Sequence, residues 1–122
     1  MQNRDFIKLA KEEYKKIGYV ECPAFFFVLV YFTHKGFEHL LMKNGKYRAH
    51  QDQIRRLSLI PYIVSITSST KEVYSYRKGH DIDFWSISGV VDNKLVIIVI
   101  RQNKGREKQF LSIMDKRLAR NA

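Results

Sequence analysis

The second half of the chain consists of short segments in which hydrophobic and polar residues alternate, and this pattern constrains the fold more than any other feature. Residues two apart lie on the same face of a β-strand, so the alternation predicts strands. The sequences between the segments are typical of hairpin turns: Lys78-Gly79, Asp92-Asn93-Lys94 and Asn103-Lys104-Gly105. The pattern predicts an antiparallel meander of four strands, over Glu72–Arg77, Phe84–Val91, Leu95–Gln102 and Gln109–Asp115.

Two segments are hydrophobic without alternation. Leu95–Ile100 is apolar at every position, which predicts a central strand with both faces covered, at least in part by helices. The run Ala24–Phe32 has about half the ~20 residues that a helix needs to span a bilayer. Its aromatic and β-branched residues predict a buried strand that is central or well covered.

Hydrophobic residues at three- and four-residue steps predict helices in the first half of the chain. The first helix is expected over Asp5–Ile17, because one face is apolar and Gly18 provides a stop. A second, short helix is expected to begin after Thr33 as N-cap, with His34 at its positive end, and to end at Asn44-Gly45.

A third helical pattern begins near Gln51 and must bend or restart at Pro61, because proline lacks a backbone donor. The predicted fold class is α+β, with N-terminal helices packed on a four- or five-stranded antiparallel meander. A chain of 122 residues, of which 45% are hydrophobic, suffices for one core. We therefore expect a single domain over 1–122, with its core at 3–116 and a frayed basic tail at 117–122.

The net charge of +10 indicates a polyanionic partner, and we expect nucleic acid rather than a membrane surface. Residues 34–60 carry six Lys and Arg against two Asp and Glu, so this part is the expected contact surface. Cys22 is the only cysteine, which excludes an intrachain disulfide. The chain shows neither Cys/His metal spacing nor a secretory leader, so we predict no metal, no cofactor and a cytoplasmic site of action.

Several motifs from residue 34 to residue 116 point to one family. They are HKGFEHLLMKNGKYR (34–48), QIRRLSLIPYI (53–63), EVYSYRK (72–78), FWSI (84–87), IVIRQ (98–102) and QFLSIMDK (109–116). Together they resemble the phage and bacterial-toxin branch of the ribonuclease superfamily that groups barnase, EndoU, the tRNA-cleaving colicins and RelE. The resemblance implies metal-independent cleavage of RNA, often tRNA, by a toxin that a cognate inhibitor, such as an antitoxin or immunity protein, restrains.

In such enzymes the ribose 2′-hydroxyl attacks the neighbouring phosphorus and leaves a 2′,3′-cyclic phosphate. His34 is the expected proton-transfer group, because a helix N-terminus favours the neutral imidazole and binds phosphate. His39 is the second choice, since it lies about 140° around the helix from His34. Lys35 is expected to hold a phosphate oxygen, Arg101 to clamp the scissile phosphate, and Ser112 to donate to the same oxygens.

Further residues are expected to bind the rest of the RNA. Tyr76 and Trp85 are candidates for stacking on bases, and the candidates for backbone contacts are Lys43, Arg48, Arg55 and Arg56. Each choice has a structural alternative: His34 as an exposed capping residue, Arg101 as an ion-pair partner, and the aromatic rings as sheet packing. Two other functions stay open, a non-catalytic nucleic-acid-binding module and a protein whose basic face docks an acidic partner.

Overall fold

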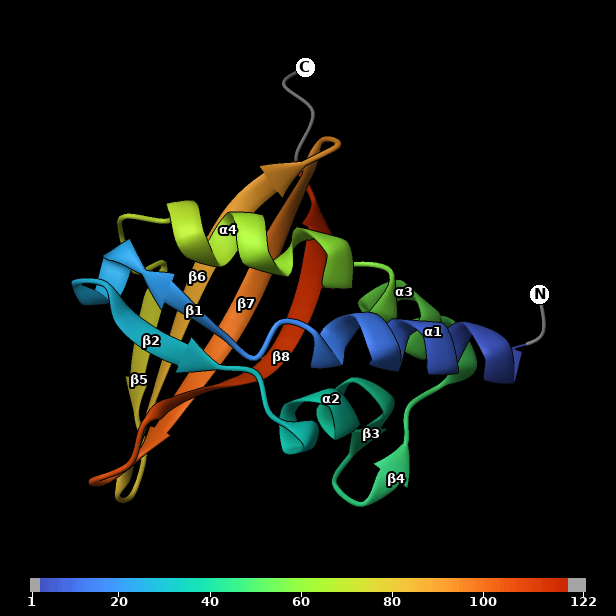
Figure 1. Cartoon of the computed structure of the whole chain (residues 1–122), viewed down its shortest axis with the longest axis horizontal. Coiled ribbons are helices and arrows are strands. Elements are labelled where there is room, and N and C mark those ends of the chain that lie inside the picture. Colours follow the sequence, from blue (N-terminus) through green and yellow to red (C-terminus); the bar gives the residue numbers. More distant parts are fainter. Residues whose placement is uncertain (1–2, 119–122) are drawn as a thin grey trace.

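A twisted β-sheet forms one layer of this computed structural model, which describes residues 3–118, and helices pack against it (Figure 1). Helix α4 crosses the sheet, while α1, α2 and α3 gather beside β8. The elements in chain order are α1 (Asn3–Lys15), β1 (Tyr19–Cys22), the 3-10 helix η1 (Pro23–Phe25), β2 (Val28–Tyr31), α2 (His34–Leu41), β3 (Met42–Lys43), β4 (Lys46–Tyr47), α3 (His50–Leu57), the 3-10 helix η2 (Ile60–Tyr62), α4 (Ile63–Ser69), β5 (Ser75–Lys78), β6 (Ile82–Val91), β7 (Lys94–Asn103) and β8 (Lys108–Arg117).

The predicted α+β class and the predicted meander are confirmed, because β5, β6, β7 and β8 pair successively and antiparallel. The sheet of the described residues has six strands in the order β1-β2-β8-β7-β6-β5, rather than four or five. The β1–β2 hairpin joins through a short parallel contact, in which Val30 lies opposite Lys108 and Tyr31 opposite Gln109. The expectation of a wholly antiparallel sheet is therefore wrong at this one pair of strands.

The central position of β7 is confirmed, and it brings the hydrophobic core together. Val96, Ile98 and Ile100 are fully buried on one face of the strand. They belong to a cluster that also includes Tyr14 of α1 and Ile63 of α4. Every helix that reaches this cluster is thereby fixed relative to the middle of the sheet.

The prediction of one buried central strand over Ala24–Phe32 is wrong. Pro23 starts a turn in which the Phe26 N–H donates to the Pro23 carbonyl and the Phe27 N–H donates to the Cys22 carbonyl, both at 3.0 Å. Only the residues after this turn form β2, which lies second from the edge of the sheet. Hydrophobicity alone did not reveal the turn, because Phe25 is 7% exposed and the adjacent Phe26 is 92% exposed.

The predicted helices form with shifted boundaries, and α1 covers Asn3–Lys15 rather than Asp5–Ile17. The Thr33 side chain accepts a hydrogen bond from the Gly36 N–H at 3.4 Å, which confirms the predicted N-cap. Helix α2 ends at Leu41, earlier than predicted, because Asn44 and Gly45 form the turn between β3 and β4 with left-handed φ values of 53° and 76°. The predicted restart at Pro61 is confirmed, since η2 and α4 follow α3 there.

Helix α2 lies against β8 through a glycine. A Cβ atom at Gly36 would lie 2.6 Å from the Phe110 carbonyl oxygen and 2.8 Å from the Tyr14 hydroxyl. We expect Gly36→Ala to lower the free energy of unfolding by roughly 1–3 kcal/mol through overpacking, although alanine favours helices. Urea unfolding followed by circular dichroism measures this change. Equal or greater stability would show that α2 can move away from β8 without loss.

The end of the chain departs from the predicted frayed tail at 117–122. Arg117 still pairs with Lys94 in the sheet, and the Leu118 N–H donates to the Asn93 carbonyl at 3.3 Å. The remainder of that tail, residues 119–122, lies outside the described residues. Among residues 3–118, no helix combines the length and hydrophobicity needed to cross a membrane.

Candidate functional site

Basic side chains from several elements meet around one imidazole beside β8. Partial burial lowers the pKa of His39, and nearby positive charges lower it further, in the order Arg101, Arg48, Lys35 and Arg56. We name this group the His39 cluster and add Ser112, which binds one of its arginines: its members are His39, Lys35, Arg48, Arg56, Arg101 and Ser112. An imidazole with a lowered pKa is mostly uncharged at neutral pH and can accept a proton.

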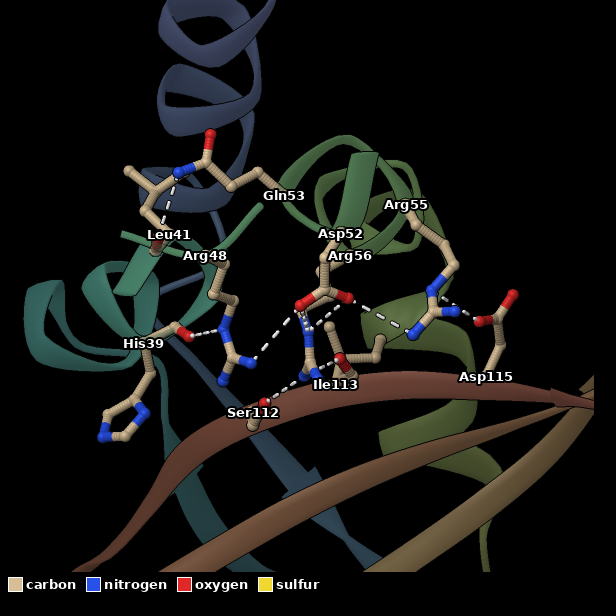
Figure 2. A network of polar contacts seen from close by, with 10 residues as sticks. All are labelled: His39, Leu41, Arg48, Asp52, Gln53, Arg55, Arg56, Ser112, Ile113 and Asp115. Atoms are coloured by element: carbon tan, nitrogen blue, oxygen red, sulfur yellow. Dashed lines mark hydrogen bonds and ion pairs between the residues drawn. The ribbon is translucent and has the colours of Figure 1, made fainter. Parts of the chain in front are cut away.

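Arg48 fixes the end of α2 that carries His39 (Figure 2). Its Nε donates to the His39 main-chain carbonyl at 2.9 Å, and its guanidinium contacts the Asp52 carboxylate at 3.4 Å. The Gln53 side-chain amide donates to the Leu41 carbonyl at 3.0 Å. These bonds use main-chain carbonyls of α2 and leave the His39 ring out of the network. Figure 2 shows that the ring points away from it.

Asp52 of α3 holds three arginines with one carboxylate. The nitrogen–oxygen distances are 3.4 Å to Arg48, 3.3 Å to Arg55 and 3.2 Å to Arg56. Burial raises the pKa of Asp52, but the positive charges of Arg56, Arg48 and Arg55 outweigh it and lower the pKa below its usual value. Asp52 therefore stays ionised and keeps Arg48 and Arg56 in place.

Arg56 connects α3 to β8. One guanidinium nitrogen donates to the Ser112 hydroxyl at 2.9 Å and to the Ile113 carbonyl at 3.0 Å. Beyond Gln109, β8 has no strand partner on the side away from β7 among the described residues. Arg56 thus satisfies a carbonyl on the open edge of β8, and Ser112 is a partner of Arg56 in this structure.

Arg101 lies in β7 opposite Phe84 and Gln109. It shares a face with Val99, which lies opposite Ser112, so Arg101 and Ser112 are on the same face of the sheet. The Nε of Arg101 is buried and has no hydrogen-bond partner within the described part of the chain. The charge of this guanidinium acts on His39 through space and lowers the pKa of the imidazole.

His39 opens onto a surface hollow of about 220 Å³. Lys35, Glu38 and Met42 line the same hollow, together with Asn44 and Gly45 of the β3–β4 turn. The hollow thus presents an imidazole and an ammonium group, with one carboxylate beside them. Such a pair suits a phosphate and part of its sugar.

The structure places His34 elsewhere. Its Nε2 lies 2.9 Å from the Glu38 carboxylate, and its side chain is 62% exposed. It lines a separate cavity of about 110 Å³ against Lys11 and Lys15 of α1. The charge of Arg101 thus lowers the pKa of His39, while His34 contacts Glu38 and faces α1.

The residues predicted to contact RNA are arranged differently from one another. Lys43 is exposed on β3, and Arg55 pairs with Asp52 and also with Asp115 at 3.3 Å. The Tyr76 and Trp85 rings lie 5.7 Å apart, and the Tyr76 hydroxyl donates to Asp83 at 2.6 Å. Trp85 lies opposite Ile100, so its face of the sheet is the one that Arg101 does not share.

The acidic side chains of the site, Asp52 and Asp115, were not predicted from the sequence. Asp52 lies four residues after Arg48 and four before Arg56, a spacing at which helical side chains pair, and this signal was available. No local spacing predicts the pairing of Asp115 with Arg55, because the two residues are 60 positions apart in the sequence (55 and 115). The spacing of Asp52 from Arg48 and Arg56 thus predicts which basic side chains are held by ion pairs.

Comparison with known proteins does not place the chain. No family model, no curated protein and no solved structure matches it at a significant level. Within residues 3–118, no group of three or more His, Cys, Asp or Glu side chains is placed to hold a metal ion. The geometry and charge of the His39 cluster therefore carry the functional proposal.

Proposed function

We propose that the chain is a metal-independent endoribonuclease of the barnase, EndoU, colicin and RelE type, with its reaction centre at the His39 cluster. The observation that supports this most is that His39 and Lys35 line one surface hollow, where partial burial and the charges of Arg101, Arg48, Lys35 and Arg56 lower the pKa of His39. Cleavage of RNA without a metal needs a proton acceptor for the 2′-hydroxyl and positive charge around the phosphate. The cluster supplies both groups.

In the proposed reaction, His39 accepts the proton of the ribose 2′-hydroxyl. The 2′-oxygen forms a bond to phosphorus, and the bond from phosphorus to the 5′-oxygen breaks. The positive charge of Arg101 favours the neutral form of His39, and Lys35 adds positive charge from the hollow. The departing 5′-oxygen takes up a proton from solvent, which gives a 2′,3′-cyclic phosphate and a free 5′-hydroxyl.

The test is incubation of the purified protein with tRNA and with unstructured RNA in excess chelator. We expect cleaved RNA with 2′,3′-cyclic phosphate ends, identified by mass spectrometry. Intact RNA at every protein concentration would overturn the proposal. RNA that is bound but never cleaved would support the second candidate, a nucleic-acid-binding module, which the net charge of +10 favours.

A cognate inhibitor is part of the same proposal. The inhibitor is expected to present carboxylates to this positively charged surface, because opposite charges stabilise an interface and like charges destabilise it. RNA and such an inhibitor are then expected to compete for the cluster.

The pH dependence of cleavage follows from the direction of the His39 pKa shift. The proton acceptor must be neutral, and the His39 pKa is lowered from 6.5, so the neutral fraction rises with pH through a value below 6.5. We expect kcat/KM to rise across this range and to be level from about pH 7 upward. The Arg101→Gln variant removes one of the charges that lower this pKa, so its profile is expected to shift to higher pH. A rate that falls as pH rises through the same range would show that His39 acts as an acid instead.

A further inference from the structure

The loop between β1 and β2 presents two phenylalanine rings to solvent. Phe26 is 92% exposed, and Phe27 is 63% exposed. Phe26 is the most exposed large hydrophobic residue in the part of the chain that the structure describes. Phenylalanine at such a position loses the stabilisation of burial, so its presence calls for a role outside the core.

This loop is held rigidly in an unfavourable backbone conformation. Phe26 and Phe27 have left-handed φ values of 56° and 65°, which residues with bulky side chains rarely adopt. The Phe25 ring packs edge-on against Trp85 at 5.5 Å, and the Ala24 N–H donates to the Thr70 carbonyl at 2.9 Å. A loop anchored on both sides loses little entropy when its exposed rings bind a partner.

The surface beneath the loop combines aromatic rings with a cation. The Lys108 ammonium lies 5.1 Å from the Phe25 ring centroid and 4.5 Å from the Trp85 ring centroid. The chain as a whole carries a charge of +10. Positive charge selects a polyanion, and exposed rings select a polyanion with flat π-faces. A nucleic-acid strand with unpaired bases has both negative phosphates and flat π-faces, whereas an anionic lipid surface has only the negative charge.

We propose that Phe26 and Phe27 form a second RNA-binding site, in which they stack on unpaired bases. This inference rests on the proposed function for the identity of the nucleic acid. In Figure 1 the turn between β1 and β2 lies at one end of the long axis, while α2 lies near its middle. An RNA that occupies both sites must span this separation, so the substrate is a folded RNA with a single-stranded loop rather than a short oligonucleotide.

The test measures RNA affinity in a His39→Ala background with chelator, so that cleavage does not interfere. Fluorescence anisotropy with a labelled stem–loop RNA is expected to show about tenfold weaker binding when Phe26→Ser and Phe27→Ser are combined. Binding of an abasic strand of the same charge is expected not to change. Val90→Ser is the matched control, because Val90 is a 66% exposed hydrophobic residue near the end of β6. This variant is expected to keep full affinity for RNA.

Glycine variants separate binding from folding. Glycine adopts left-handed φ without strain, so Phe26→Gly and Phe27→Gly are expected to keep or raise the melting temperature while weakening RNA binding. Unchanged affinity for the stem–loop in both the serine and the glycine variants would overturn the inference. Loss of binding to phosphatidylserine vesicles without loss of RNA affinity would overturn it in favour of a membrane contact. If the wild-type protein never cleaves RNA but the loop variants still bind RNA more weakly, the loop site is supported and only the enzyme proposal is overturned.

Discussion

His39→Ala is expected to slow RNA cleavage by about 10²–10⁴-fold while leaving the fold intact. The reason for the large loss is that burial and nearby positive charges lower the pKa of His39, which favours the neutral imidazole that accepts the 2′-hydroxyl proton. The reason for the intact fold is that Arg48 binds the His39 main-chain carbonyl rather than its ring. Single-turnover rates on the same RNA, together with the circular dichroism spectrum and melting temperature, measure both parts of this expectation.

Two other histidines make the experiment decisive. His80→Ala changes a fully exposed side chain in the turn between β5 and β6, and it is the control for substitution of a histidine as such. His34→Ala removes an exposed side-chain contact with Glu38, so it is expected to keep the cleavage rate within a few-fold. Loss of cleavage in His34→Ala with retention in His39→Ala would return the catalytic role to His34.

Asp52→Asn is expected to lower the free energy of unfolding by roughly 2–3 kcal/mol at neutral pH, less than the ~3–5 kcal/mol for a fully buried pair because the Asp52 side chain is 28% exposed. The substitution keeps the size of the side chain and removes the charge that Arg48 and Arg56 share. Their side chains are only 10% and 11% exposed, so their charges would remain poorly compensated. Urea unfolding at constant ionic strength gives the difference.

The same variant gives a pH test with a defined sign. Because the pKa of Asp52 is lowered from 3.8 in the folded protein, its contribution to stability is complete above that value and is lost as pH falls through the lower folded pKa. The stability difference between wild type and Asp52→Asn is therefore expected to shrink in acid. Asp92→Asn is the matched control, since Asp92 lies in an exposed turn with a left-handed φ of 47° that asparagine tolerates. A difference that is constant from neutral pH down to about pH 2 would contradict the assigned role of Asp52.

The meander was predictable because its information is local. Alternation sets which side chains share a face, and turn residues such as Asp92-Asn93 set where each strand ends. The β1–β2 hairpin was not predictable in the same way, because its place beside β8 depends on a parallel contact between Val30 and Lys108 that no local pattern specifies. The exposure of Phe26 depends likewise on a turn that hydrophobicity conceals.

The site shows the same division between local and tertiary information. Arg101 and Ser112 were expected to act on the same phosphate, and the pairing of Val99 with Ser112 puts them on one face of the sheet. The choice of His34 over His39 relied on the local advantage of a helix N-terminus. Which histidine meets Arg101 depends on how α2 is turned against β8, and the close approach of Gly36 to Phe110 sets that rotation. A single sequence carries no direct record of this contact.

The hydrogen bonds of Arg56 to β8 also bear on how the chain avoids self-association. An unpaired strand edge is a template onto which another extended chain can add, and Arg56 occupies the Ile113 carbonyl on that edge with a charged group. Arg56, which lowers the pKa of His39, is thus also expected to hinder the pairing of this strand edge with another chain. Loss of the Arg56 side chain would therefore remove both a positive charge near His39 and the cover of this strand edge.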